Sequence, residues 1–236
     1  MRIIIDSFPE FIRNSKLLFN FSRLIFRVPL ELYYFRKKYD EGLIGDISQY
    51  YNDENNNSLK RISNTTDINS FHVRIIKKYF KLYSPRTLLD VGCGSGYLLN
   101  KLRELNTKTK MYGVDYQVPF LKKNKINFIK GDILSTISNF SDNQFEFVMC
   151  SHVIEHLENP NLVIMELKRI CSGILIIICP IEKKFKWGMN YHINFFSKKQ
   201  FFIKFLEKIL NEKNSKKFKY KKYYFLGDLM YLEFIL

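Results

Sequence analysis

The sequence predicts an α/β fold: a doubly wound sheet of seven mostly parallel strands that ends in an antiparallel hairpin. Two observations support this fold class. From Phe71 onward, short apolar runs alternate with segments of helical periodicity, the pattern of a parallel sheet covered by helices on both faces. The last two apolar runs are joined by Gly227-Asp228, a pair typical of a tight turn between antiparallel strands.

The apolar runs and the periodic segments place each element along the chain. The run at 174–179 is apolar without interruption, as in strands that are buried on both faces. In the helical segments, apolar residues recur at spacings of three and four. Pro160 is suited to a first helical turn, and the Ser197 hydroxyl is suited to an N-cap. We expect strands at 87–91, 110–114, 126–129, 145–150, 174–179, 218–226 and 229–236, and helices at 97–105, 118–124, 160–170 and 197–210.

The chain divides into two regions. Residues 1–70 are expected to form a helical N-terminal extension followed by a polar linker, and residues 71–236 the main domain. Leu17 and Phe21 lie at helical spacing in the extension. The stretch 46–70 is rich in Asn and lacks any apolar period, which is typical of a linker or loop.

Composition excludes several classes of protein. Of the 236 residues, 46% are hydrophobic and 26% are charged, which suits a globular domain rather than a disordered chain. No apolar run approaches the ~20 residues of a membrane span. Asp6 and Glu10 interrupt the N-terminal stretch where a secretory signal would be apolar. We therefore expect a cytoplasmic protein. Its basic, apolar N-terminal segment leaves peripheral membrane contact or a lid over the site open.

Charge and cysteine content add weaker constraints. The net charge is +15, and residues 181–236 contain thirteen lysines against five acidic residues. Such a basic surface leaves anionic partners open, nucleic acid among them though not favoured, and we prefer the interpretation as a lysine-rich solvated face. The cysteines lie in apolar or glycine-rich segments without a CxxC pair, so we expect buried thiols rather than disulfides or a zinc site: Cys93, Cys150, Cys171 and Cys179.

A glycine-rich turn follows the first expected strand, in the run LLDVGCGSGYLL at 88–99. Asp90 ends the strand, and Gly92, Gly94 and Gly96 allow backbone N–H groups to approach a ligand closely. The third glycine comes one residue earlier than in the dinucleotide-binding fingerprint, so the turn does not indicate a pyrophosphate site.

Acidic residues end the next two strands. Asp115 follows the second strand and is well placed to accept both hydroxyls of a ribose. The third strand ends in Gly131-Asp132-Ile133, where a carboxylate suits an adenine amino group and Ile133 suits the face of the ring. These features occur in order on consecutive strands and together predict a nucleoside-binding site at the carboxyl end of the sheet.

With these motifs, the region from about 71 to 236 resembles the class I S-adenosylmethionine-dependent methyltransferases. It is most similar to the type 11 group of ubiquinone-biosynthesis and surface-sugar methyltransferases. The matching segments are DVGCGSG (90–96), YGVD (112–115), KGDI (130–133), FEFVMCSHVIEHLENP (145–160) and HINFFSKKQF (192–201). The resemblance implies a Rossmann-like seven-stranded sheet and S-adenosylmethionine as cofactor. It implies cofactor contacts from Asp90, Gly92, Cys93, Gly94, Gly96, Asp115, Asp132, Ile133, Ser151 and His152.

Methyl transfer to a hydroxyl needs a base close to the acceptor. His156 follows the fourth strand and His192 the fifth, so we predict these two as catalytic. We assign no metal ligand. Whether a divalent cation binds there stays open, because imidazoles and carboxylates are common metal ligands. The groups in question are His152, Glu155, His156 and His192.

The expected function is methyl transfer from S-adenosylmethionine to an acceptor hydroxyl. The resemblance favours a small-molecule or lipid-linked sugar used in surface-glycan assembly. The alternatives are a quinone or lipid phenol at a membrane, a ribose 2′-hydroxyl of RNA, and a non-catalytic partner subunit.

Overall fold

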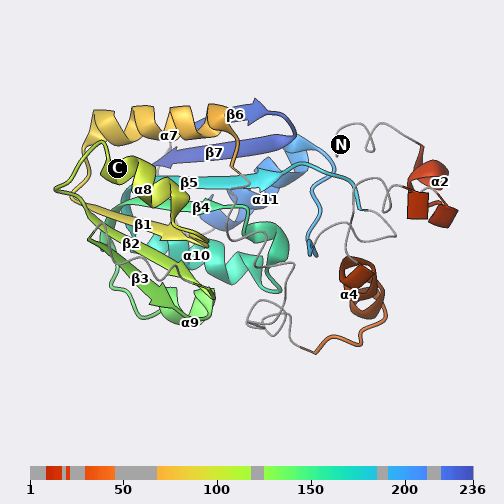
Figure 1. The fold of residues 1–236 in the computed structure, drawn as a ribbon. Helices are drawn as coiled ribbons and strands as arrows, with labels where there is room; N and C mark the ends of the chain where they lie inside the picture. The colour runs from red at the N-terminus through yellow and green to blue at the C-terminus, as the bar shows by residue number, and fades with distance from the viewer. Residues whose placement is uncertain are drawn as a thin grey trace.

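The computed structural model describes residues 9–17, 20–21, 30–45, 68–117, 125–184, 191–211 and 219–235. Seven strands form one sheet in the order β3-β2-β1-β4-β5-β7-β6 (Figure 1). The first five strands are parallel, and β7 pairs antiparallel with both β5 and β6, which confirms the predicted fold class. The strands are β1 (Thr87–Val91), β2 (Lys110–Asp115), β3 (Ile126–Lys130), β4 (Phe145–Ser151), β5 (Cys171–Pro180), β6 (Lys219–Phe225) and β7 (Asp228–Phe234).

Helices cover both faces of this sheet. One face packs against α7 (Ser70–Tyr83) and α8 (Tyr97–Arg103). The other packs against α9 (Ile133–Ile137), α10 (Pro160–Ile170) and α11 (Lys199–Asn211). The sheet thus forms the middle of three layers, and the helices of these layers cover its faces rather than the ends of its strands (Figure 1).

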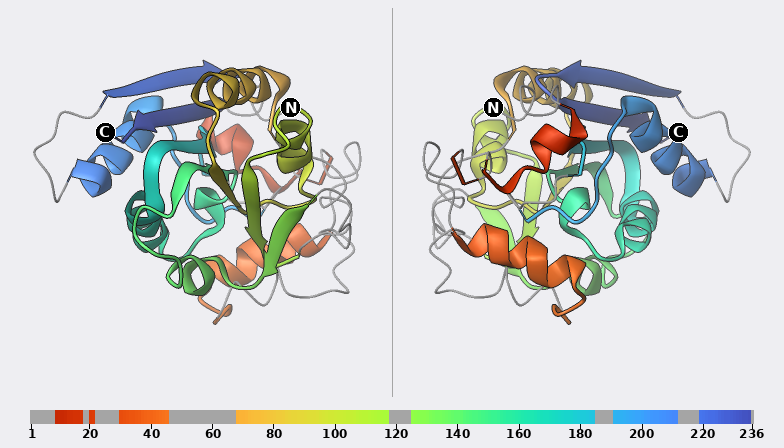
Figure 2. Two further views of the ribbon diagram at one scale, coloured as in Figure 1. Left: turned by 90° about the vertical axis from the view of Figure 1, so that its left-hand side faces the viewer. Right: turned by 90° about the vertical axis from the view of Figure 1, so that its right-hand side faces the viewer.

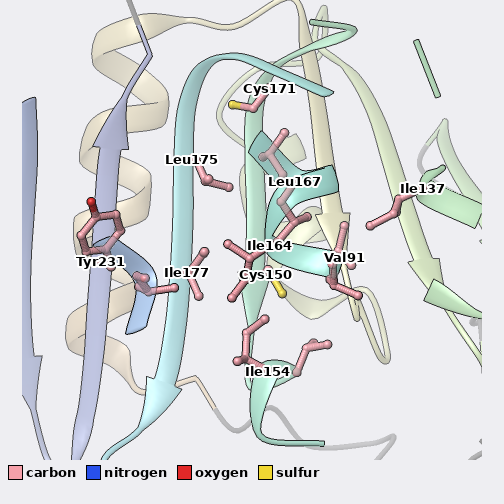
Figure 3. Close-up of a cluster of buried hydrophobic side chains, with 14 of the residues drawn as sticks. Val91, Ile137, Cys150, Ile154, Ile164, Leu167, Cys171, Leu175, Ile177 and Tyr231 are labelled. Atoms are coloured by element: carbon pink, nitrogen blue, oxygen red, sulfur yellow. The ribbon is translucent and has the colours of Figure 1, made fainter. Parts of the chain in front are cut away.

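The central strand β5 shows why its sequence is apolar throughout. Leu175 and Ile177 point to the face covered by α10, where they meet Ile164 and Leu167 (Figure 3). Ile176 belongs to the cluster on the opposite face. Alternate side chains thus enter two different cores, so neither set can be polar.

Several elements differ from the sequence prediction. Helix α9 was not expected: it spans only five residues, and Asp132 caps it by accepting a hydrogen bond from Ser135 N at 2.8 Å. Helix α11 begins at Lys199, so the N-cap position falls on Lys198 and the predicted N-cap Ser197 lies one residue too early. The predicted helix at 118–124 and most of the predicted linker lie outside the described residues. The four cysteines are buried free thiols, as expected.

Part of the N-terminal extension is described. It contains α2 (Glu10–Arg13) and α4 (Leu30–Asp40). Helix α4 lies at the end of the molecule toward which the parallel strands point (Figures 1 and 2). The rings of Phe35 on α4 and Tyr191, which follows β5 in the chain, are 4.8 Å apart and meet edge to face. Among the residues described, none of the helices is long and apolar enough to cross a membrane.

Candidate active site

The glycine-rich turn between β1 and α8 is held by hydrogen bonds to the end of β2. Gly92 N donates to Val114 O at 2.8 Å. Gly92, Gly94 and Gly96 all have positive φ angles, which L side chains rarely adopt. A Cβ atom at Gly92 would lie 2.1 Å from Val153 Cγ2, whereas one at Gly94 would meet no atom within 4 Å. Gly92 therefore serves packing, and Gly94 lines open space at the turn.

Asp115 and Asp132 connect the three predicted motifs. Asp115 accepts hydrogen bonds from Gly94 N at 2.8 Å and from Gln117 N at 3.0 Å. Tyr116, the next residue, donates its hydroxyl to Asp132. Burial raises the pKa of Asp115. Burial also acts to raise the pKa of Asp132, but the hydrogen bonds that this carboxylate accepts, chiefly from Ser135 and Tyr116, together lower it below its usual value. The structure thus brings the ends of β1, β2 and β3 together as the sequence predicts.

Asp90 lies near the end of β1, and Cys93 lies within the turn. Asp90 is buried, and this burial, with a smaller effect of the Asp115 charge, raises its pKa to about 8. Cys93 is also buried, and a Cβ atom at Gly113 would lie 2.8 Å from its sulfur. Both side chains are therefore shielded from solvent.

The end of β4 carries Ser151 and His152. Ser151 Oγ is buried and has no hydrogen-bond partner among the described residues. His152 has a φ angle of 56°, in the left-handed region that is uncommon for residues other than glycine. Its Nδ1 lies 3.4 Å from Glu155 Oε1 and its Nε2 lies 3.9 Å from Asp228 Oδ2. The imidazole therefore lies between two carboxylates.

The predicted catalytic histidines are neighbours in space. The rings of His156 and His192 are 4.7 Å apart and meet edge to face. His156 Nδ1 lies 3.2 Å from Tyr191 O, and His192 Nδ1 is hydrogen-bonded to Glu182 Oε1. Burial lowers the pKa of His156 to about 4, so this ring is neutral at pH 7.

The open question of a metal ion concerns the same side chains. Glu155, His156 and His192 each offer one ligand atom, and these atoms all lie within 4.8 Å of one another. Burial would raise the pKa of Glu155, but hydrogen bonding to His152 and the nearby imidazoles together lower it to about 2, so the carboxylate is ionised. This arrangement is compatible with a divalent cation. The hydrogen bonds of these side chains to neighbouring residues also explain their positions without an ion.

Sequence reasoning missed three residues near the site. Glu182 lies just after the carboxyl end of β5. The criterion that identified Asp115, an acidic residue at the carboxyl end of a parallel strand, applies to Glu182 as well. Asp228 begins β7 and accepts a hydrogen bond from Asn69 Nδ2 at 3.0 Å. Arg36 on α4 donates to the backbone oxygen of His192. No spacing in the sequence links Arg36 to a residue so distant in the chain.

Three features of the described residues fit a nucleoside-containing cofactor. They are the open space at Gly94, the carboxylates of Asp115 and Asp132 at successive strand ends, and the Ser151 hydroxyl without a hydrogen-bond partner. Comparison with known proteins defines the class. Residues 89–177 match the family described as "Methyltransferase domain". Over this segment the chain is therefore similar to methyltransferase domains, the class whose cofactor is S-adenosylmethionine.

Individual relatives are more distant. The mitochondrial ubiquinone biosynthesis O-methyltransferase of Candida albicans is 30% identical over 112 residues, which cover 43% of this chain and 34% of that protein. The tRNA U34 carboxymethyltransferase of Nautilia profundicola is 33% identical over 101 residues, covering 40% of this chain and 33% of that protein. The chain thus spans about a third of the length of these two relatives.

A solved structure shows the same fold over most of the chain. A plantazolicin methyltransferase in complex with a substrate analogue and S-adenosylhomocysteine (SAH) superimposes with a TM-score of 0.56. The match covers 91% of this chain and 98% of that one at 16% sequence identity. The likeness therefore extends to the fold as a whole.

Proposed function

We propose that this protein transfers the methyl group of S-adenosylmethionine to the hydroxyl oxygen of a small acceptor. The observation that carries the proposal is the placement of the His192–Glu182 pair at the same end of the sheet as the three cofactor motifs. When bound, S-adenosylmethionine supplies a methyl group on a positively charged sulfur.

The cofactor contacts follow the order of the strands. Gly92, Gly94 and Gly96 would bind the methionine part, and Asp115 the ribose hydroxyls. Asp132 and Ile133 would bind the adenine. Ser151 and His152 would line the region of the methyl group. Two observations support this assignment: the open space at Gly94 and the unpartnered hydroxyl of Ser151.

His192 is the proposed general base. If Nδ1 donates its proton to Glu182, Nε2 carries the lone pair that can take a proton from the acceptor. The Glu182 carboxylate then stabilises the imidazolium that forms, as in other histidine–carboxylate pairs. His156 stays neutral because burial lowers its pKa, so it adds no opposing positive charge beside His192. His156 thus acts on the reaction through His192.

The proposed step is balanced. A bond forms between the acceptor oxygen and the methyl carbon as the sulfur–methyl bond breaks, which leaves SAH. The acceptor proton passes to Nε2 of His192 and then to solvent. The protein contributes chiefly by holding the acceptor oxygen in line with that bond, because positioning lowers the barrier substantially.

An aromatic hydroxyl is the acceptor we favour. The Candida albicans relative is named for O-methylation in ubiquinone biosynthesis. A phenol, with a pKa near ~10 as in tyrosine, gives up its proton to an imidazole more readily than an alcohol does. The sugar acceptor expected from the sequence gains no support from the comparisons and stays a prediction.

The test is methyl transfer from S-adenosylmethionine carrying a radiolabelled methyl group. Candidate acceptors are a catechol, the matching aromatic amine, a nucleotide sugar and RNA. We expect label on the catechol, and strongly reduced transfer with His192→Ala. Binding of the cofactor without transfer to any acceptor would instead favour a non-catalytic partner subunit. Label on the amine rather than the catechol would contradict O-methylation.

A second candidate function is metal-assisted methylation of RNA. The cluster of Glu155, His156 and His192 and the net charge of +15 favour it, as does the name of the Nautilia profundicola relative. In this case a divalent cation should be required. Labelled RNA whose formation is abolished both by a chelator and by His156→Ala would replace the first candidate with the second.

A further inference from the structure

Arg36 is a buried cation at the edge of the candidate active site. It lies on α4, and the residue is only 2% exposed. One of its terminal nitrogens, Nη2, donates to the backbone oxygen of His192. The other two nitrogens, Nε and Nη1, are buried and have no hydrogen-bond partner among the described residues. Within the described part of the chain, two nitrogens of the guanidinium, with three N–H groups between them, therefore remain available as donors.

The surroundings of Arg36 do not satisfy these donors. Its guanidinium carbon lies 4.7 Å from the centre of the Phe195 ring, a stacking contact that fixes its plane without accepting a hydrogen bond. Asp40 lies close enough to interact with its charge, but Asp40 Oδ1 bonds to Lys184 Nζ at 2.9 Å. Glu182 also lies close, and its Oε1 bonds to His192.

The balance of charge points the same way. Burial lowers the pKa of Arg36, although Asp40 and Glu182 both raise it. The nearby carboxylates thus do not fully replace the hydration that the guanidinium loses. Leaving a charged donor buried without a partner is costly, and folded proteins rarely tolerate it.

We propose that the unpartnered N–H groups of Arg36 bind an anionic group, a carboxylate or a phosphate, of the acceptor. Each of these groups donates a charge-assisted hydrogen bond to an oxygen of either anion, and either Nε or Nη1 can pair with the remaining N–H of Nη2 to hold two oxygens at once. Because Nη2 of the same side chain holds the backbone of His192, the anion would bind next to the proposed base. Helix α4 would then contribute to acceptor recognition.

This inference rests on the proposed function in one respect, that the anion belongs to the acceptor. The test therefore measures binding rather than turnover, by isothermal titration calorimetry with and without SAH. The probes are para-hydroxybenzoate, its neutral analogue para-hydroxybenzamide, and para-hydroxyphenyl phosphate. They differ in charge but share the phenol, and the two charged probes separate a carboxylate from a phosphate site.

Three variants accompany the native protein. Arg36→Met removes the guanidinium but keeps an unbranched side chain, and Arg36→Lys keeps the charge but loses the paired donors. Lys37→Met is the matched control, because Lys37 is the next residue on α4 and its side chain is 55% exposed. It removes the same charge from the helix surface.

We expect the native protein to bind one of the charged probes about tenfold more tightly than the neutral one. Arg36→Met should abolish this preference, Arg36→Lys should reduce it, and Lys37→Met should retain it. Equal affinity of the native protein for all three probes, or no binding of the charged probes at millimolar concentration, would overturn the proposal. A preference that survives in Arg36→Met would do so too.

Two features keep the test decisive. If Arg36→Met does not fold, the comparison of charged and neutral probes in the native protein, together with Arg36→Lys, still decides. Methyl transfer is scored separately. Anion-selective binding without methyl transfer to any acceptor would retain the Arg36 site and reject the proposed function, whereas transfer to a neutral phenol without charge preference would do the reverse.

Discussion

The carboxylate of Asp115 accepts a hydrogen bond from the backbone N–H of Gly94, with 2.8 Å between Oδ2 and N. This contact joins the end of β2 to the turn after β1, so the carboxylate that we propose for the ribose also shapes the turn that we propose for the methionine part. A change at Asp115 is therefore expected to affect both the ribose contact and the conformation of the turn.

Replacing Asp115 with Ala should abolish cofactor binding. S-adenosylmethionine at ~100 times its dissociation constant should stabilise the native protein by ~2.7 kcal/mol, seen as an increase of several degrees in the unfolding midpoint. The variant should show no increase, because the ribose loses its acceptor. Asp142→Ala is the control, since that side chain is largely exposed and pairs with Arg169. Equal increases in Asp115→Ala and the control would contradict the assignment.

The two glycines of the turn should respond differently to substitution. Gly92→Ala places a methyl group against Val153 and should lower the free energy of unfolding by several kcal/mol, about the cost of overpacking plus an unfavourable φ angle. Gly94→Ala meets open space and should cost only ~1–2 kcal/mol, but it should weaken cofactor binding. Denaturant unfolding and cofactor titration of both variants provide the test. A larger loss of stability in Gly94→Ala would show that the turn packs differently.

Glu182 and His192 should act as a unit in catalysis. We expect His192→Ala to lower kcat about 10²–10⁴-fold, the usual contribution of a general base. Glu182→Gln should also lower kcat, because it removes the charge that stabilises the imidazolium. The double variant should be little worse than His192→Ala, since the carboxylate acts through the imidazole. Losses that multiply in the double variant, measured at saturating cofactor, would mean that the two residues act independently.

Asp90 should make stability depend on pH. Its pKa is raised from 3.8 to about 8 in the folded protein, chiefly by burial. The folded state therefore holds a proton that the unfolded chain releases, and the free energy of unfolding should fall as pH rises from about 4 to about 8. The slope from this group is at most ~1.4 kcal/mol per pH unit.

The control for this prediction is Asp90→Asn, which keeps the shape and cannot ionise. Denaturant unfolding of both proteins across this pH range isolates the contribution of Asp90, because other titrating groups affect both alike. A difference in stability that does not change with pH would mean that Asp90 is ionised in the folded protein.

The sheet could be predicted from the sequence because its strands carry strong local patterns. The uninterrupted apolar run of β5 reflects burial on two faces. The glycine between the last two apolar runs marks the final hairpin, but its turn consists of Leu226 and Gly227 rather than the predicted Gly227-Asp228, because Asp228 already pairs with Phe225. Helix α9 escaped prediction because it is too short to show a period. Its N-cap residue, Asp132, is predicted from the sequence only as a cofactor contact, so the start of the helix is not recognised.

The candidate site was predictable only where it lies at strand ends. Asp115 and Ser151 end β2 and β4, so strand order alone brings them to one edge. The contact between Arg36 and His192 joins residues 156 positions apart, and no local pattern encodes it. Asp228 was similarly hidden, because its part in a turn accounted for it without reference to Asn69 or His152.

The chain has four histidines, and each one lies within this same region. His72 contacts Asn69 and Tyr223, Asn69 contacts Asp228, and Asp228 lies beside His152. His152 in turn contacts Glu155, next to His156 and His192. Isotopic labelling of histidine alone would therefore yield a magnetic resonance spectrum with signals from the site and no background from the rest of the chain. Ligand binding could then be followed ring by ring without assigning the whole protein.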